Sequence, residues 1–265
     1  MFLLKVISVY NNKMDTKLKE TLIKASLIFM TVLFIFTLLI KRFIYFRPSY
    51  HFIQTKEKYL DINHGHLNGW LLENEKETAK IILICHGNGG NISYEESRMV
   101  ALRNLGYSVL AFDYSGYGKS GGVPSEQQLY DDASAMVALL RQNYNPEQII
   151  IYGVSIGGPV ATYIARRYSI PTLILESPLP SIQALIESKY PMFSFVKPLF
   201  PEFDTSSYLD GFRGKSLLLH SLTDEVIPYD SVKKLINLCS LHIQIRGSHS
   251  YPEIPWEDVK TFIEK

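Results

Sequence analysis

The sequence predicts an α/β protein whose central sheet is mostly parallel and carries helices on both faces. Short apolar runs alternate with helical segments from about residue 58 to the C terminus. Strands that are buried on both faces have such continuous apolar sequences, and a helix is the usual connection between parallel strands. In addition, the pentapeptide GVSIG at residues 153–157 lies between an apolar run and a helical segment. That order of strand, G-x-S-x-G and helix is typical of a sharp turn that presents a nucleophilic serine.

The predicted elements follow in chain order. Two short strands come first, at Lys58–Ile62 and Gly69–Leu72. Buried strands are then expected at Ile81–Cys85, Ser108–Asp113, Ile149–Gly153, Thr172–Glu176, Ser216–His220 and His242–Arg246. Helices are expected at Glu95–Leu105, Ser125–Asn143, Pro159–Arg167, Tyr229–Leu238 and Trp256–Ile263. Ser125 and Gln128 have the spacing of a capping box, which marks the start of the second of these helices.

A different kind of segment precedes this pattern. Residues 25–40 carry no charge. The run can be extended back to Thr21 if the Lys24 side chain reaches toward the lipid headgroups. It then has about 20 residues, which is enough to cross a bilayer as a helix. The run ends in LLIKRF, without the small residues of a cleavage site, so we expect an uncleaved anchor. The expected division is an N-terminal segment at 1–20, a transmembrane anchor at 21–43, a linker at 44–57 and a catalytic domain at 58–265.

Three points about this anchor stay open from the sequence. An interfacial or core helix is the structural alternative to a membrane span. Lys and Arg are similarly dense on both flanks, so the orientation in the membrane is not indicated. Met14 is an alternative start, because the anchor does not need the residues before it.

The composition excludes several classes of function. The chain has 27 Lys and Arg against 26 Asp and Glu, a formal net charge of +1, which indicates neither nucleic acid nor a strongly charged substrate as partner. Its two cysteines, Cys85 and Cys239, lie far apart in or beside apolar stretches, where buried free thiols are typical. No Cys and His spacing is that of a zinc site. We therefore expect no metal, no cofactor and no nucleic-acid partner, and the oligomeric state is not indicated.

A serine hydroxyl needs a base and an acid to become a good nucleophile, and the sequence supplies both after strands. Asp224 follows the strand that ends at His220, and His249 follows the last strand. Open α/β sheets place their sites at the carboxyl ends of strands, and the order serine, acid, histidine is the one used with this turn. We therefore predict Ser155 as nucleophile, Asp224 as acid and His249 as base. Glu176, at the end of another strand, is the alternative acid.

Attack on a carbonyl creates a negatively charged oxygen, which two backbone N–H groups usually bind. One is expected from Ile156, the residue after the nucleophile. The other is expected from the loop HGNGGN at 86–91, which directly follows a buried strand. We predict Asn88 as this second donor, and the glycines allow the backbone to approach the substrate. His86 is expected to be a structural histidine rather than a catalytic one.

The chain resembles the serine α/β-hydrolase family on the segments LICHGNGGN, AFDYSGYGKSGG, YGVSIGG, LESP, LLLHSLTDEVIP and GSHS. More narrowly, it resembles the membrane-anchored branch that includes protein depalmitoylases and lipid hydrolases. The resemblance covers roughly residues 55–265 and implies the α/β-hydrolase fold with a short helical lid at about 177–213. It maps Ser155, Asp224 and His249 onto the family's triad, and Asn88 and Ile156 onto its oxyanion donors. The loop GSHSYPEIP departs from the common Gly-Gly-His-Asn form, which leaves its local geometry open.

Two nucleotide-binding patterns are discarded. Residues 116–121 satisfy G-x-G-x-x-G after a strand, but the next helix begins late, at Ser125, and no acidic residue ends the following strand. Residues 118–120 match the end of a P-loop, but Asp113 stands where the first glycine of that loop belongs.

The lid carries the substrate hypothesis. It is short and rich in large apolar side chains, which indicates either a small cap packed on the core or an acyl pocket open toward a bilayer. We expect acyl-chain esters or thioesters as substrates, with Tyr190, Phe193 and Phe195 as candidate substrate-binding residues, and a membrane as partner through the N-terminal helix. Short soluble esters, peptides and amides stay open as substrates. A non-catalytic binding module of the same fold is the alternative outside enzymes.

Overall fold

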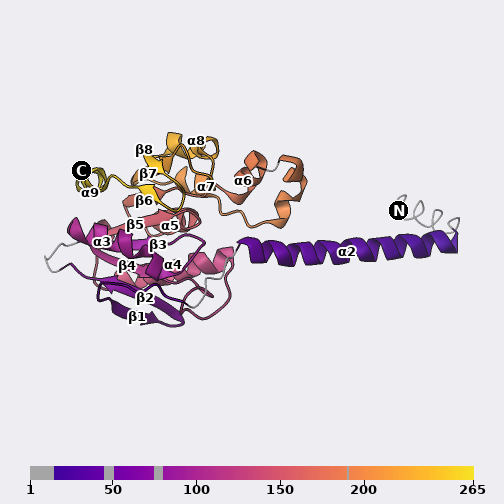
Figure 1. Ribbon diagram of the computed structural model, residues 1–265, viewed down its shortest axis with the longest axis horizontal. Coiled ribbons are helices and arrows are strands. Elements are labelled where there is room, and N and C mark those ends of the chain that lie inside the picture. Colours follow the sequence, from indigo (N-terminus) through magenta and orange to yellow (C-terminus); the bar gives the residue numbers. More distant parts are fainter. Residues whose placement is uncertain (1–14, 45–50, 75–79, 190) are drawn as a thin grey trace. The chain divides into compact units, whose positions relative to one another are not determined.

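The computed structural model describes residues 15–44, 51–74, 80–189 and 191–265, and the chain divides at residue 44 into two units. In the first unit the described residues form one helix, α2 (Thr16–Ile44), which covers the predicted anchor (Figure 1). Charged side chains occupy its first turns, at Lys17, Lys19, Glu20 and Lys24. Among the described residues, no helix combines the length and the apolar character needed to cross a membrane. The predicted transmembrane span is therefore not supported, although the helix itself is present.

The second unit is built on one sheet, which has nine strands in the described residues, in the order β1-β2-β4-β3-β5-β6-β7-β8-β9. The strands are β1 (Leu60–His64), β2 (Leu67–Leu72), β3 (Ile81–Cys85), β4 (Ser108–Phe112), β5 (Ile149–Val154), β6 (Thr172–Glu176), β7 (Lys215–Ser221), β8 (Leu241–Gly247) and β9 (Pro252–Glu253). The block from β4 to β8 is parallel, whereas β1, β2 and β9 pair antiparallel at the two edges. The predicted, mostly parallel sheet is thus confirmed.

Helices cover both faces of this sheet. They are η1 (Ile92–Glu95), α3 (Glu96–Asn104), α4 (Glu126–Leu140), η2 (Pro146–Gln148), α5 (Gly157–Arg167), α6 (Ile182–Lys189), η3 (Pro191–Leu199), α7 (Thr205–Leu209), α8 (Tyr229–Leu238) and α9 (Trp256–Glu264). On one face, Leu102 of α3 and Phe262 of α9 join a buried cluster with strand residues such as Ile84 and Tyr152. On the other, α5 packs on β5 and contacts α4 and α7, and α7 contacts α8. This double-sided arrangement is what continuous apolar strands require.

Local sequence explains where the elements start and stop. The Ser125 hydroxyl accepts a hydrogen bond from the Gln128 backbone N–H at 3.1 Å and so caps α4, as predicted. The Nε2 group of the Gln128 side chain donates to Asp132 at 2.8 Å. The helix after the serine turn begins at Gly157, two positions before the predicted Pro159, since proline fits within a first helical turn.

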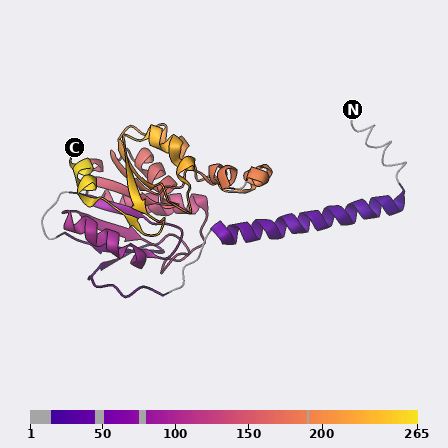
Figure 2. The same cartoon turned by 45° about the horizontal axis from the view of Figure 1, so that its top comes forward.

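The lid consists of short helices rather than one continuous cap. α6, η3 and α7 occupy it, and Figure 2 shows α6 and η3 (orange) as a segment that stands out from the sheet. Pro191 begins η3 and Pro198 lies near its end, so no long helix can form there. The apolar side chains of Ile182 and Ile186 are buried and attach α6 to the rest of the unit.

The register of the parallel strands determines where the site lies. Cys85 is paired with Gly153, Glu176 with Leu219, and Ser221 with Ile245. The carboxyl ends of β3, β5, β6, β7 and β8 therefore meet at one edge of the sheet. The loops that follow these strands carry every residue predicted for the triad and the oxyanion site.

Candidate active site

Ser155 occupies a strained turn between β5 and α5. Its φ angle is +54°, a left-handed conformation that a non-glycine residue rarely adopts. Its backbone N–H donates to the Glu176 carbonyl at 3.0 Å, and its carbonyl accepts the N–H groups of Gly158 and Leu179, both at 2.9 Å. Backbone strain of this kind costs of order 1–3 kcal/mol and persists only where the surroundings hold it. The three backbone hydrogen bonds provide that hold.

The glycines on both sides of Ser155 are required by packing. A Cβ atom on Gly157 would lie 2.0 Å from the Cys85 carbonyl oxygen, and one on Gly153 would lie 2.6 Å from the Ala161 Cβ. Both separations are shorter than any real contact. The chain can therefore turn this sharply, directly against β3, only with glycine at both positions.

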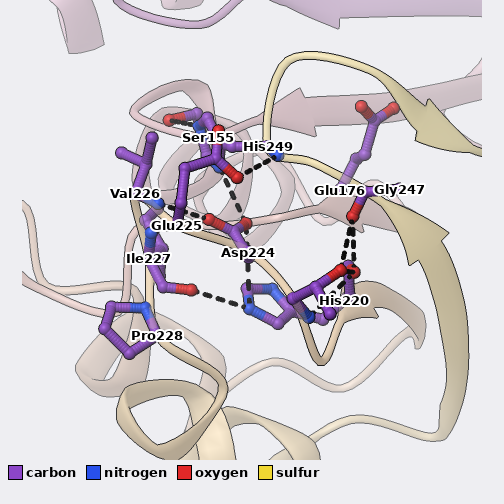
Figure 3. A network of polar contacts seen from close by, with 12 residues as sticks. Ser155, Glu176, His220, Asp224, Glu225, Val226, Ile227, Pro228, Gly247 and His249 are labelled. Carbon is purple, nitrogen blue, oxygen red and sulfur yellow. Dashed lines mark hydrogen bonds and ion pairs between the residues drawn. The ribbon is translucent and has the colours of Figure 1, made fainter.

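The structure brings Ser155, His249 and Asp224 together in one hydrogen-bonded line (Figure 3). The His249 Nε2 atom lies 3.0 Å from the Ser155 Oγ, and the His249 Nδ1 atom lies 2.8 Å from Asp224 Oδ2. The serine comes from the β5–α5 turn, the carboxylate from the loop after β7 and the imidazole from the loop after β8. This geometry suits transfer of the serine proton to a histidine that a carboxylate orients.

Asp224 is buried and held as a carboxylate. Its Oδ1 atom accepts the backbone N–H groups of Val226 at 2.9 Å and Ile227 at 2.7 Å, which leaves Oδ2 for His249. Burial by itself raises the pKa of Asp224, but the hydrogen bonds from His249 and Ile227 outweigh it, so the net shift is downward. His220, fully buried at the end of β7, places its Nε2 atom 3.1 Å from the Ile227 carbonyl and steadies the same loop.

The loops that carry Asp224 and His249 are bonded to each other. The Ser221 hydroxyl donates to the Gly247 carbonyl at 2.7 Å, and the Thr223 hydroxyl donates to the same oxygen at 3.1 Å. The Glu225 carboxylate accepts the backbone N–H of His249 at 3.1 Å. These bonds resolve the local geometry of the unusual GSHS loop, because they fix where it leaves β8.

The glycine-rich loop after β3 lies directly beside the serine. A Cβ atom on Gly87 would lie only 3.6 Å from the Ser155 Cβ. The Tyr117 hydroxyl donates to the Asn88 Oδ1 at 2.6 Å and so fixes that side chain. Ile156 follows the serine and is buried just before α5. The structure therefore places both predicted oxyanion residues on the two segments that border Ser155.

His86 is buried at the start of the same loop, as a structural histidine would be. Its Nδ1 atom lies 2.7 Å from the Gly87 carbonyl, and its ring packs on Tyr114 with centroids 4.4 Å apart. Burial lowers the pKa of His86, so the ring is neutral and Nδ1 carries the donated hydrogen.

The structure does not bring Glu176, the alternative acid, to His249. Its carboxylate accepts the Arg98 guanidinium, with Nε at 2.9 Å, and the Tyr152 hydroxyl at 2.6 Å. Arg98 also pairs with Glu95 at 3.0 Å. Glu176 is thus fully used in a buried ion cluster that braces β6 and α3.

The three candidate substrate-binding residues of the lid are not brought to the triad by what the structure describes. Tyr190 lies outside the described residues, and so does the side chain of Phe193. The Phe195 side chain is 78% exposed and faces solvent rather than a closed pocket. In the described part of the chain, no group of three or more His, Cys, Asp or Glu side chains could hold a metal ion.

Sequence reasoning missed three residues that shape the site: Tyr117, His220 and Glu225. Tyr117 lies within the segment AFDYSGYGKSGG, which we considered for the family resemblance and for nucleotide binding but not as a part of the site. His220 was treated as the end of a strand, and Glu225, beside the predicted acid Asp224, was assigned no role. All three act through hydrogen bonds to loop atoms, which leave no spacing signature in a single sequence.

Comparison with known proteins identifies the family of the chain. The sequence matches the family described as serine aminopeptidase, S33, over residues 76–224. The chain belongs to this family of serine α/β hydrolases. A lysophosphatidylserine lipase of Danio rerio is 32% identical over 210 residues, which cover 71% of this chain and 54% of that protein. The chain thus spans about half the length of this relative.

Two further similarities concern the membrane and the fold. An uncharacterized membrane protein of Saccharomyces cerevisiae is 32% identical over 185 residues, which cover 67% of this chain and 65% of that protein. Among solved structures, an esterase of Pyrococcus furiosus aligns with a TM-score of 0.65 at 21% identity, over 82% of this chain and 98% of that one. The second similarity confirms the α/β-hydrolase fold.

Proposed function

We propose that the protein is a serine hydrolase that cleaves carboxylic esters or thioesters through an acyl-enzyme. The observation that carries the proposal is the continuous line from Asp224 Oδ2 to His249 Nδ1 at 2.8 Å and from His249 Nε2 to Ser155 Oγ at 3.0 Å. A binding module has no need of this relay, and the strain at Ser155 is of the kind that is retained at reactive sites.

The reaction proceeds in two halves. His249 Nε2 takes the proton of Ser155 as Oγ attacks the carbonyl carbon, and the developing oxyanion is bound by the backbone N–H groups of Asn88 and Ile156. The bond to the leaving group breaks, and His249 gives its proton to the departing oxygen or sulfur. Water then attacks the acyl carbon, gives a proton to His249, and the acid leaves as Ser155 recovers its proton. Asp224 remains ionised and orients the ring throughout.

Acyl-chain esters and thioesters are the substrate class that we favour. The Danio rerio relative is named for hydrolysis of a lysophospholipid, and the lid is rich in large apolar residues. Amide hydrolysis is the second candidate, because the matching family is described as a serine aminopeptidase. Hydrolysis rates across esters of two to sixteen carbons, with aminoacyl amides in parallel, separate the two. Loss of activity beyond four carbons contradicts the acyl-chain assignment.

Labelling with a fluorophosphonate tests the nucleophile directly. The wild-type protein should be labelled, and Ser155→Ala should not, because the probe reacts only with an activated serine. Ser231→Ala, which changes a serine of α8, is the matched control and should label as wild type does. If the folded wild-type protein is not labelled, the proposed function is wrong and the non-catalytic binding module becomes the favoured alternative.

We also propose that α2 holds the protein at a lipid membrane. It leaves many large apolar side chains exposed along its length: Leu18, Leu22, Ile23, Leu27, Ile28, Phe29, Met30, Val32, Phe34, Ile35 and Phe36. An apolar helix is unfavourable in water unless something covers it. The full chain should sediment with membranes and be released by detergent but not by high salt, whereas a variant that begins at residue 45 should stay in the supernatant. Recovery of the full chain in the soluble fraction refutes this assignment.

A further inference from the structure

Glu225 follows the proposed acid in the chain and holds the proposed base. Its carboxylate oxygen Oε2 accepts the backbone N–H of His249 at 3.1 Å (Figure 3). The hydroxyls of Ser221 and Thr223 hold the base of this loop at the Gly247 carbonyl, whereas Tyr251, two residues after His249, is 82% exposed. A bond to the backbone of His249 therefore limits how far the whole residue can move, independently of the bonds that its ring makes.

The same residue is held from the lid. The ammonium group of Lys189, the last residue of α6, donates to the Glu225 backbone carbonyl at 2.8 Å. Within the lid, Lys197 of η3 forms an ion pair with Glu187 of α6. A continuous chain of polar contacts thus leads from η3 through α6 and Glu225 to His249.

We propose that Glu225 is a positioning residue that couples the lid to the base, with its carboxylate on the His249 backbone and its carbonyl on Lys189 of α6. When α6 shifts, the Glu225 backbone shifts with it, and the imidazole moves relative to Ser155. A base that is misplaced by about 1 Å can lower the rate about a hundredfold. The lid thereby controls turnover as well as substrate access.

The electrostatics favour this arrangement. The hydrogen bond from the His249 backbone N–H lowers the pKa of Glu225. This bond therefore favours the ionised form of the Glu225 carboxylate. A charged acceptor makes a stronger bond than a neutral one. The bond loses this added strength only as the pH falls through the lowered pKa of Glu225.

The test uses the full chain and four variants. Glu225→Ala removes the acceptor, Glu225→Gln keeps an acceptor oxygen without the charge, and Lys189→Met removes the lid contact but keeps the apolar stem. Lys233→Met, which removes an exposed lysine paired with Asp230 on α8, is the matched control. Hydrogen exchange of residues 247–251 is followed by mass spectrometry, and kcat and KM are measured with p-nitrophenyl butyrate.

The segment 247–251 should exchange faster in Glu225→Ala and also in Lys189→Met, where the substitution lies in the lid, but not in Lys233→Met. In Glu225→Ala, kcat should fall about tenfold with KM nearly unchanged, and Glu225→Gln should recover most of the loss. Unchanged exchange in Glu225→Ala overturns the proposal. If exchange becomes faster in Glu225→Ala but not in Lys189→Met, the proposed coupling of the lid to His249 is wrong.

The inference rests on the proposed hydrolase function, and the two can fail separately. If the wild-type protein hydrolyses no ester and takes no fluorophosphonate, the function is wrong. The exchange comparison still decides whether the lid and the His249 loop are coupled, because it does not depend on turnover.

Discussion

The Nε2 atom of His249 lies 3.0 Å from the Ser155 hydroxyl oxygen, although 94 positions of the chain separate the two residues. Parallel strands make this possible, because β5 and β8 end at the same edge of the sheet while whole crossover units lie between them. The contact therefore depends on the fold as a whole. The proposed chemistry is therefore best tested by substitutions that leave the fold intact and alter only the hydrogen bonds among Ser155, His249 and Asp224.

Asp224→Asn should separate catalysis from stability. The amide can still accept the N–H groups of Val226 and Ile227, but it cannot favour the tautomer and the charge that His249 needs. We expect kcat to fall about ten-thousandfold while the melting temperature changes little. Asp230→Asn, on the exposed first turn of α8, is the control and should match the wild type. A loss of less than tenfold in Asp224→Asn argues that another group is the acid.

The dependence of kcat/KM on pH should report one proton on the acid side. His249 must be neutral to accept the Ser155 proton, so the rate falls as the ring becomes protonated. The pKa of Asp224 is held below its ordinary value, so this carboxylate keeps its charge to a lower pH than an ordinary aspartate does. A plot of log kcat/KM against pH should therefore have a slope of about one. A slope of two, or a rate that is flat down to pH 4, is incompatible with this assignment.

The sheet was predictable because buried parallel strands are written as uninterrupted apolar runs. The predicted bounds of Ile81–Cys85 and Thr172–Glu176 agree with those of β3 and β6. The short edge strand β9 was not predicted, since two residues carry no periodicity. The lid was predicted only as a region, because prolines interrupt any helical period there and packing on the rest of the unit determines its shape.

The candidate site was predictable where its residues follow strands in a fixed order. Ser155, Asp224 and His249 could be chosen because the ends of β5, β7 and β8 were themselves evident. The residues that support them could not be chosen in this way. Tyr117 and Glu225 reach the site by hydrogen bonds from loops whose course depends on tertiary packing. The apolar run at 25–40 predicted a helix correctly. Whether this helix spans a membrane is a separate question, which helix formation does not answer.

Gly157→Ala tests the claim that packing requires glycine after the serine. The added methyl group would meet the carbonyl oxygens of Cys85 at 2.0 Å and His86 at 2.7 Å, both backbone atoms that cannot rotate away. We expect destabilisation of about 3 kcal/mol or more, measured by denaturant unfolding. Gly89→Ala is the matched control in the glycine-rich loop, where nothing lies within 4 Å of an added Cβ, and it should unfold as the wild type does. Equal stability of the two variants contradicts the packing argument.

Tyr117→Phe tests whether the oxyanion loop is held from a neighbouring loop. The Tyr117 hydroxyl donates to the Asn88 side chain at 2.6 Å, and its removal frees the segment whose N–H group we assign to the oxyanion. A donor that is less well placed lowers transition-state stabilisation more than substrate binding, so kcat should fall about tenfold with KM nearly unchanged. Tyr107→Phe is the matched control, because Tyr107 is buried and its hydroxyl has no hydrogen-bond partner among the residues that the structure describes. Steady-state kinetics on both variants decide the matter: a similar loss in both points to packing, whereas a loss confined to Tyr117→Phe assigns the effect to the bond with Asn88.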